Sequence, residues 1–285
     1  MKILDNKITL NSILNSSEKK DGSRGDSHQN LYNYIKNFKT EEDQVLISIV
    51  LPMYNEEKTI KNVLEELPND GAIEIIVVND HSIDNSLREI KKVQLKRGIR
   101  LINNKRDRGY GNAIISGISH TNGKIIVTMD SDGQHSSDDI LNMVKPILDG
   151  EADYTLGSRY KGTYFYELPV ITRLGEIIVE KLIQILFGPK VMNNQTGFRA
   201  FNRKVLPIFK NTKYHGYAFC TEQILIVALA HFKIKECPIK VYRRIHGSSG
   251  IILTKLAKSI FSCIFHYYIQ KLKHLIKKPS RMQDH

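Results

Sequence analysis

The segment Lys124-Ile-Ile-Val-Thr-Met-Asp-Ser-Asp132 decides how this chain is interpreted. Its apolar part, residues 125–129, predicts a buried strand that ends before a glycine. Asp130 and Asp132 stand one residue apart at the strand end, where two carboxylates repel each other unless a positive charge lies between them. A divalent cation shared with substrate phosphates commonly supplies that charge. An acidic turn leading into a helix near Ser136 is the alternative.

The composition limits the class of protein. With 285 residues and 41% hydrophobic content, the chain can bury one sizeable core. Its 42 basic against 30 acidic side chains give a net charge of +12, which favours nucleic acid, phosphorylated substrates or an anionic membrane as partners. Three separated cysteines without a C-x-x-C pair indicate neither a disulfide framework nor a zinc site, and favour a reducing compartment. We find no signal peptide and no apolar run of bilayer-spanning length, so we expect a soluble or membrane-surface protein.

Apolar strands alternate with helices on both sides of the opening segment. This alternation, with strands apolar on both faces, predicts an α/β fold whose sheet is mostly parallel and flanked by helices. Ligands bind at the carboxyl ends of the strands in such sheets, where polar stretches follow here at 52–56, 79–81 and 103–106. The predicted strands are 45–51, 73–78, 99–102, 125–129, 154–156, 197–201 and 234–241, and the predicted helices are 57–67, 86–96, 111–120, 137–148, 168–186 and 221–230.

The two ends of the chain differ from this middle part. Residues 1–44 are polar and aperiodic, which predicts a flexible N-terminal extension with one short helix near 31–38. Residues 45–249 would form the α/β domain. Residues 250–285 predict a basic amphipathic helix with an apolar stripe on one face and lysines on the other. Such a helix suits a membrane interface, and docking on the domain or on a second copy is the alternative.

Seven motifs occur along the chain in a fixed order. They are Ser48-Ile-Val-Leu-Pro-Met-Tyr-Asn-Glu56, Ile76-Val-Val-Asn-Asp-His-Ser-Ile-Asp84, Arg108-Gly-Tyr-Gly-Asn-Ala113, Met129-Asp-Ser-Asp-Gly-Gln-His135, Gly157-Ser-Arg159, Thr196-Gly-Phe-Arg-Ala-Phe201 and Arg244-Ile-His-Gly-Ser-Ser249. In this order the chain resembles family 2 glycosyltransferases of the dolichyl-phosphate mannose or glucose synthase kind. The resemblance implies the GT-A fold, in which a nucleotide-binding α/β sheet merges with an acceptor-binding half.

The resemblance implies a donor site for a nucleotide-diphosphate sugar. Asp130 and Asp132 would hold Mg²⁺ or Mn²⁺ against the diphosphate, where the ion neutralises charge as the nucleoside diphosphate leaves. Arg244 would close over the diphosphate, which suits a permanently charged group that binds two oxygens at once, and Arg243 is a rival for this role. The further residues expected at the nucleotide are Pro52, Tyr54, Glu56, Asp80, Gly109 and Gly111.

The acceptor side is implied by residues whose roles stay open. Gln134, Arg159, Arg199 and Ser249 fall in motifs that the resemblance associates with the sugar or the acceptor. Arg159 and Arg199 either bind an acceptor phosphate or anchor loops through buried ion pairs. Glu222 lies where relatives place an acid near the acceptor, and would join Asp132 and Arg244 in catalysis as a general base for a hydroxyl acceptor. A lipid phosphate needs no base, and Glu222 would then be a helix-start carboxylate.

Three departures from the family pattern concern donor preference. Asn79 and His81 replace a common Asp and Gly, and Asn193 replaces an Asp. We expect an inverting enzyme that moves mannose or glucose from a GDP- or UDP-sugar to dolichyl or polyprenyl phosphate, peripherally at the cytoplasmic face of the membrane. Transfer to a sugar hydroxyl of a glycan or surface polysaccharide is the alternative, and a sugar-nucleotide-binding protein without catalysis is a third. Nucleic-acid binding is disfavoured, because the basic residues do not interleave with a stacking aromatic platform.

Overall fold

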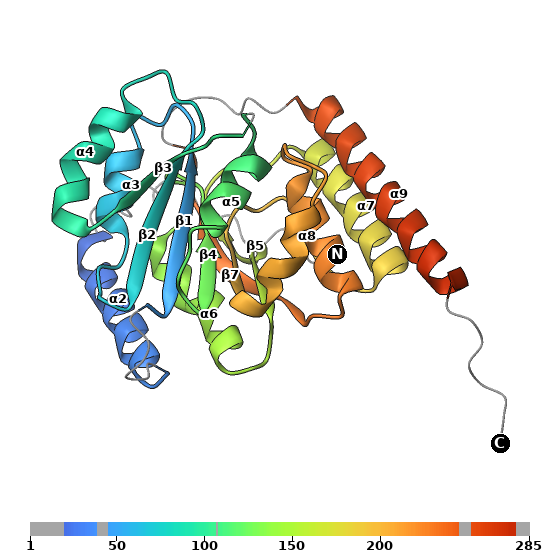
Figure 1. Cartoon of the computed structure of the whole chain (residues 1–285), viewed down its shortest axis with the longest axis horizontal. Coiled ribbons are helices and arrows are strands. Elements are labelled where there is room, and N and C mark those ends of the chain that lie inside the picture. The colour runs from blue at the N-terminus through green and yellow to red at the C-terminus, as the bar shows by residue number, and fades with distance from the viewer. Residues whose placement is uncertain (1–19, 39–44, 107, 245–251, 278–285) are drawn as a thin grey trace.

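The computed structural model describes residues 20–38, 45–106, 108–244 and 252–277 (Figure 1). Within these residues one seven-stranded sheet has the order β3-β2-β1-β4-β6-β5-β7. The strands are β1 (Ile47–Met53), β2 (Ile73–Asn79), β3 (Arg100–Asn103), β4 (Ile125–Thr128), β5 (Tyr154–Tyr164), β6 (Arg199–Asn202) and β7 (Ile234–Val241).

The direction of the strands confirms a mostly parallel sheet. β1 pairs in parallel with β2 and β4, β2 pairs in parallel with β3, and β5 pairs in parallel with β7. β6 is antiparallel to both of its neighbours, β4 and β5, so in the described sheet it runs against the other strands. The chain moves outward from β1 to β3 and then returns to place β4 on the other side of β1. The carboxyl ends of β1 and β4 therefore flank a topological switch point, where open α/β sheets bind ligands.

Helices cover both faces of the sheet (Figure 1). The first hydrophobic core holds side chains of α2, α3, α4 and α6, and the second holds side chains of α5, α7, α8 and α9. Alternation along β1 produces this division, because Ile49 and Leu51 belong to the first core and Val50 to the second. The helices are α2 (Lys20–Lys36), α3 (Ile60–Glu66), α4 (Ser86–Arg97), α5 (Tyr110–Ile118), α6 (Ile140–Leu148), α7 (Val170–Phe187), α8 (Phe219–Leu229) and α9 (Leu253–Lys277), with 3₁₀ turns η1 (Ser137–Asp139) and η2 (Arg203–Asn211).

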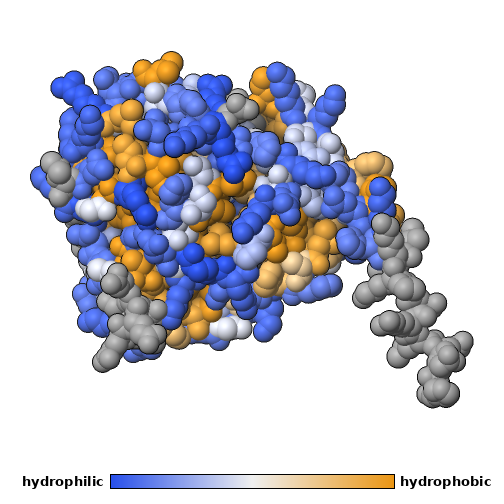
Figure 2. All heavy atoms as spheres, viewed as in Figure 1, coloured by the Kyte–Doolittle hydropathy of each residue, from blue (hydrophilic) through white to orange (hydrophobic). Residues whose placement is uncertain are grey.

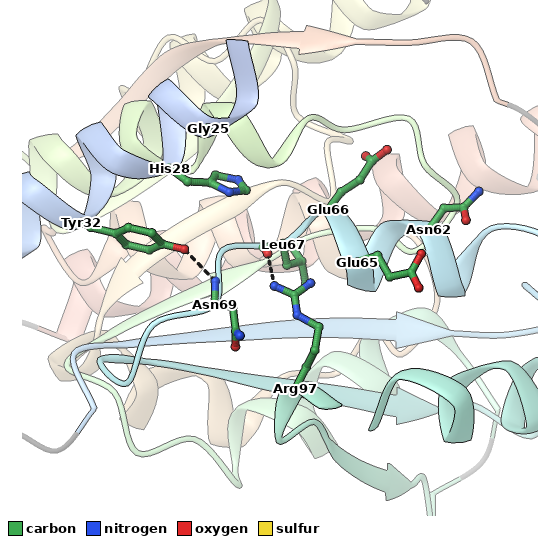
Figure 3. Close-up of a pocket in the computed structure, with 9 residues that line it drawn as sticks. All are labelled: Gly25, His28, Tyr32, Asn62, Glu65, Glu66, Leu67, Asn69 and Arg97. Carbon is green, nitrogen blue, oxygen red and sulfur yellow. Dashed lines mark hydrogen bonds between the residues drawn. The ribbon is translucent and has the colours of Figure 1, made fainter. Parts of the chain in front are cut away.

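The N-terminal helix α2 overlaps the short helix expected near 31–38 and begins earlier, at Lys20, within the segment expected to be flexible. Leu31 and Ile35 are 1% and 2% exposed and belong to the first core. The Tyr32 hydroxyl accepts a hydrogen bond from the Asn69 amide at 2.8 Å, beside a hollow in which Arg97 donates to main-chain carbonyls at the end of α3 (Figure 3). Tertiary burial holds this helix, whose polar sequence has little helical pattern of its own. Residues 1–19 and 39–44 lie outside the described part.

The C-terminal helix α9 divides the apolar stripe that the sequence predicts. Ile260, Ile264 and Tyr267 are buried in the second core, so this side of the helix is docked on the domain. Phe261 and Phe265 remain 44% and 66% exposed. The sequence left docking on the domain as the alternative to a membrane interface, and one side of the helix is docked in this way. Among the described residues, none of the helices is long and apolar enough to cross a membrane.

Candidate functional site

Asp80 follows β2 and fixes the loops at the carboxyl edge of the sheet. Its side chain is buried, and its Oδ1 accepts a hydrogen bond from Asn104 Nδ2 at 2.7 Å. Its Oδ2 accepts a hydrogen bond from the Gly109 amide at 3.0 Å. The carboxylate thus joins the loops that follow β2 and β3 to the start of α5. Asp80 is a preoriented acceptor at this edge, next to where the chain leaves β1.

The residues expected at the nucleotide from the first motif lie against the acidic segment. Pro52 O accepts a hydrogen bond from Ser131 Oγ at 2.8 Å, and Thr59 Oγ1 donates both to Ser131 O at 3.0 Å and to Glu56 Oε2 at 2.8 Å. Burial raises the pKa of Glu56, with Asp132 adding to the effect, whereas the bond from Thr59 lowers it. The ends of β1 and β4 are therefore linked directly, as their adjacency in the sheet predicts.

Tyr54 offers an aromatic face near this edge. Its ring is 39% exposed, and Arg108 Nη1 donates to the Tyr54 hydroxyl at 2.6 Å. The Arg108 guanidinium lies 4.7 Å from the ring centroid. A partly exposed aromatic ring beside a fixed carboxylate can stack a flat ligand ring while the carboxylate accepts its donors.

Asp132 and Arg244 meet although they are far apart in the sequence. Arg244 Nη2 donates to Asp132 Oδ2 at 2.7 Å, and the Gln134 amide donates to Asp132 Oδ1 at 3.0 Å. A short antiparallel bridge between His135 and Val241 brings the end of β7 to this place. Beside it, the Tyr242 amide donates to Gln134 O at 2.8 Å and Gln134 Nε2 donates to Tyr242 O at 3.1 Å. Gln134 thus lies beside the bridge and is also a neighbour of the acidic pair.

Asp130 is held in a cradle that leaves its charge poorly compensated. Burial raises the pKa of Asp130, and Asp132 raises it further, whereas His135, Tyr110 and Arg244 lower it. The His135 Nδ1 atom is 3.8 Å from Asp130 Oδ2 and makes no hydrogen bond in the described part of the chain. A Cβ atom on Gly197 would collide with the Asp130 carboxylate, so a glycine is required there.

The donor atoms of this pair fit a hard divalent cation. Within the described residues, no group of three or more His, Cys, Asp or Glu side chains is arranged to hold a metal ion. Mg²⁺ and similar ions need no such cage, because one or two carboxylates suffice when substrate phosphates and waters complete the coordination. The raised pKa of Asp130 marks a carboxylate that a cation would stabilise. Asp130 and Asp132 therefore fit Mg²⁺ or Mn²⁺ together with a diphosphate.

The glycines of the third motif pack against protein. The Gly111 amide donates to His215 O at 2.8 Å. A Cβ atom on Gly109 would lie 2.6 Å from His215 O, and one on Gly111 would lie 2.8 Å from Phe219 Cβ. These contacts give a reason for both glycines that the sequence did not predict, since it associated them with close approach of a nucleotide.

Arg159 lies in a polar cluster with a residue that the sequence did not single out, Arg173. Arg159 forms an ion pair with Glu176 and donates to Tyr166 Oη at 2.6 Å. The Arg173 guanidinium lies 3.8 Å from the ring centroid of Tyr160, and its Nη1 atom is 3.8 Å from Glu176. Arg159 Nε and Arg173 Nη1 are buried and make no hydrogen bond within the described residues. A lone arginine near the start of the apolar helix α7 was the available signal for Arg173.

Arg199 is not brought to the open site. Its side chain is 1% exposed and donates to Tyr154 Oη and to the main-chain carbonyls of Asn194, Thr196 and Cys220, all at 2.7–2.8 Å. Every one of these contacts lies inside the second half of the domain. Arg199 therefore anchors a loop, as one of its two predicted roles requires, although through carbonyls and a hydroxyl rather than an ion pair.

The Glu222 carboxylate is also inaccessible, which corrects its assignment as a candidate base. The residue is fully buried, and its Oε1 accepts hydrogen bonds from the Lys213 amide at 2.7 Å and from Tyr267 Oη at 2.6 Å. Its Oε2 accepts one from the Tyr214 amide at 3.0 Å. A general base needs an oxygen within reach of the acceptor proton, and both oxygens here are already engaged. Ser249, the remaining predicted residue, lies outside the described part.

Comparison with known proteins agrees with this fold. The fold is that of GT-A glycosyltransferases, since glucosyl-3-phosphoglycerate synthase from Mycobacterium tuberculosis, solved with Mn²⁺ and UDP-glucose, superposes with a TM-score of 0.63 at 21% identity, covering 82% of each chain. A family model described as glycosyl transferase family 2 matches residues 48–208. The chain belongs to this family.

Two relatives illustrate the family. The UDP-N-acetylglucosamine–dolichyl-phosphate N-acetylglucosaminyltransferase of Methanococcus voltae is 32% identical over 74% of this chain and 93% of its own length. The dolichol-phosphate mannosyltransferase of Pyrococcus furiosus is 26% identical over 78% of this chain and 62% of its own length. These two relatives are named for different sugars, so family membership alone leaves the donor sugar open.

Proposed function

We propose that this protein transfers a hexose from a nucleotide-diphosphate sugar to dolichyl or polyprenyl phosphate. The observation that carries the proposal is the meeting of Asp132 and Arg244 beside Asp130 at the switch point of the sheet. Two carboxylates and one guanidinium suit a diphosphate and its cation together, because each half of the set neutralises the other when no substrate is present. The names of the relatives support a lipid phosphate as acceptor.

Each residue of the donor side has a separate role in this proposal. Asp130 and Asp132 would hold Mg²⁺ or Mn²⁺, which when bound supplies Lewis-acid stabilisation of the leaving diphosphate. Arg244 would exchange its bond with Asp132 for bonds with phosphate oxygens. Asp80 would line the ribose or base while it holds the surrounding loops, and Tyr54 would be the stacking surface.

The acceptor side needs positive charge and no base. An oxygen of the lipid phosphate attacks the anomeric carbon of the sugar, the bond from that carbon to the donor phosphate breaks, and the configuration inverts in one displacement. The phosphate is already anionic at neutral pH and needs no base, which agrees with the buried and hydrogen-bonded Glu222 carboxylate. Arg159 and Arg173 carry unused donors and are our candidates for binding the acceptor phosphate.

The exposed apolar side chains of α7 and α9 support contact with a lipid surface. These two helices lie side by side (Figure 1), and hydrophobic and hydrophilic residues are mixed over the face of the molecule in view (Figure 2). Large apolar side chains that stand 44–78% exposed on them are Val170, Ile171, Leu174, Ile178, Ile185, Leu253, Phe261 and Phe265. Partly inserted apolar faces flanked by lysines are typical of interfacial helices. We infer peripheral binding at the cytoplasmic leaflet, where nucleotide sugars are present.

A transfer assay tests the proposal. The purified protein is given radiolabelled UDP- or GDP-sugars with Mn²⁺ and vesicles that contain polyprenyl phosphate, and label in the organic phase is the expected result. Asp132→Asn should abolish it, since the variant loses one of the two carboxylates. Label in a water-soluble glycan would instead support a sugar hydroxyl as acceptor. Failure of every sugar nucleotide to bind would refute a glycosyltransferase role.

A further inference from the structure

The loop between η2 and α8, residues 212–218, connects α9 to the donor side of the site. One carboxylate fixes the main chain of this loop, because Glu222 accepts hydrogen bonds from the amides of Lys213 and Tyr214 at 2.7 and 3.0 Å. The hydroxyl of Tyr267, from the middle of α9, donates to the same carboxylate at 2.6 Å. Burial and this hydrogen bond raise the pKa of Tyr267, so the hydroxyl keeps its proton and donates at neutral pH.

The other side of the same loop supports the start of α5. His215 O accepts hydrogen bonds from the amides of Gly111 and Asn112 at 2.8 and 3.4 Å. The residue before Gly111, Tyr110, stacks on Tyr217 with a centroid distance of 5.7 Å.

The start of α5 in turn holds the nucleotide-side carboxylate. The Gly109 amide donates to Asp80 Oδ2 at 3.0 Å. The path from α9 to the site therefore consists of four consecutive contacts: Tyr267 to Glu222, Glu222 to the 213–214 amides, His215 to Gly111, and Gly109 to Asp80. Each contact is a hydrogen bond: the first joins two side chains, and the other three involve main-chain groups of 213–215, Gly111 and Gly109.

We infer that Glu222 and Tyr267 are a positioning pair through which the docked helix α9 holds the donor half of the site in shape. The pair acts through the main chain of residues 213–215 and does not touch the reacting atoms. A buried carboxylate is costly unless its oxygens are satisfied by donors, so the loop and α9 must both be in place for Glu222 to be accommodated. The helix α9, which we propose to lie at the lipid surface, is thus connected by hydrogen bonds to the donor side of the site. The role of this connection in donor binding rests on the proposed function.

The first test measures the link without any substrate. Hydrogen exchange followed by mass spectrometry compares the wild type with Tyr267→Phe, which removes one hydroxyl and leaves the ring to fill its place. Losing a hydrogen bond to a charged group should speed exchange about tenfold in peptides that cover 213–215 and in those that cover 109–112. Tyr268→Phe is the matched control, because it removes a hydroxyl from the next position, on another side of the same helix, and should leave both regions unchanged.

The second test measures the consequence for the donor. Tyr267→Phe should raise the donor KM about tenfold and change kcat less, because the donor pocket loosens while the acidic pair and Arg244 remain. Glu222→Gln should act in the same direction and more strongly, since an amide nitrogen cannot accept from the main chain. A general base at this position would instead lower kcat, with the donor KM unchanged.

The outcomes separate this inference from the proposed function. Faster exchange confined to 213–215, with 109–112 unchanged, would overturn the link, as would a uniform increase across the strands of the sheet. Exchange data decide these cases even if no sugar is transferred. Transfer that fails in the wild type, with the exchange pattern as expected, would refute the proposed function and leave the positioning pair in place.

Discussion

Replacing Arg244 with Gln tests the centre of the proposed donor site. The substitution keeps most of the side-chain volume and removes the guanidinium that lies 2.7 Å from Asp132. The Arg244 side chain is 33% exposed in this ion pair, so its loss should cost at most about 1 kcal/mol of folding stability. A charge-assisted hydrogen bond to a diphosphate is worth more, about 1.5–3 kcal/mol, which corresponds to about a 10- to 150-fold loss in kcat/KM.

Arg243 provides the matched control. It is adjacent, equally charged and exposed, so Arg243→Gln changes the net charge by the same amount without touching Asp132. Initial rates over a range of donor concentrations should fall for the Arg244 variant and stay within about twofold for the Arg243 variant. A thermal melt of each variant shows that both are folded. A loss confined to the Arg243 variant would move the clamp to that residue, and equal rates in all three proteins would refute the reasoning.

Three further predictions concern pH, packing and the lipid surface. Burial raises the pKa of Asp153, but hydrogen bonds from a lysine side chain and a main-chain amide outweigh this effect and lower the pKa overall. Asp153→Asn should therefore reduce the free energy of unfolding by about 1 kcal/mol at pH 7 in urea unfolding, and this difference should vanish as the pH falls below the lowered pKa. A difference that persists at low pH would contradict this cause. Gly111→Ala should destabilise the protein by about 1–3 kcal/mol in thermal unfolding, because the new methyl overlaps Phe219. Gly175→Ala, in open space within α7, should stabilise the protein by about 0.5–1 kcal/mol. Equal shifts in the two variants would be inconsistent with the packing. Phe265→Ser should weaken binding to anionic vesicles about tenfold or more in a sedimentation assay, while Ile83→Ser, at an even more exposed apolar residue between β2 and α4, should not. Equal binding by both variants would exclude α9 from the lipid surface.

The sequence predicts the sheet well because its strands have local signals. Apolar runs at β1, β2 and β4 are bounded by polar or breaking residues, and the structure places each within two residues of the predicted limits. β5 is different, since it continues to Tyr164 where the sequence predicts only residues 154–156. Its second half pairs with β7 across a register shift, and such a partner distant in sequence leaves no local pattern.

The site residues likewise differ in whether a local sequence signal predicts their position. Asp80, Asp130 and Asp132 follow strands directly, so their convergence at one edge is predictable from the alternation of strands and helices. Arg199 and Glu222 look equally functional in sequence, but burial of a polar side chain depends on tertiary partners such as the carbonyl of Asn194 and the hydroxyl of Tyr267. The burial of Leu31 in the first core is likewise set by the rest of the fold, which explains why the sequence predicts only a short helix near 31–38 and not the whole of α2.

Under the proposed function, the hydrogen bonds between Gln134 and Tyr242 would determine when during synthesis this protein can first bind its donor. The two residues are 108 positions apart, so at about 5–20 residues per second the second leaves the ribosome about 5–20 s after the first. During that interval Asp130 and Asp132 exist without Arg244, and a nascent chain has half of a binding site. Affinity for the sugar nucleotide would thus appear only once β7 has joined the sheet, which makes donor binding a natural indicator that the domain has completed its folding.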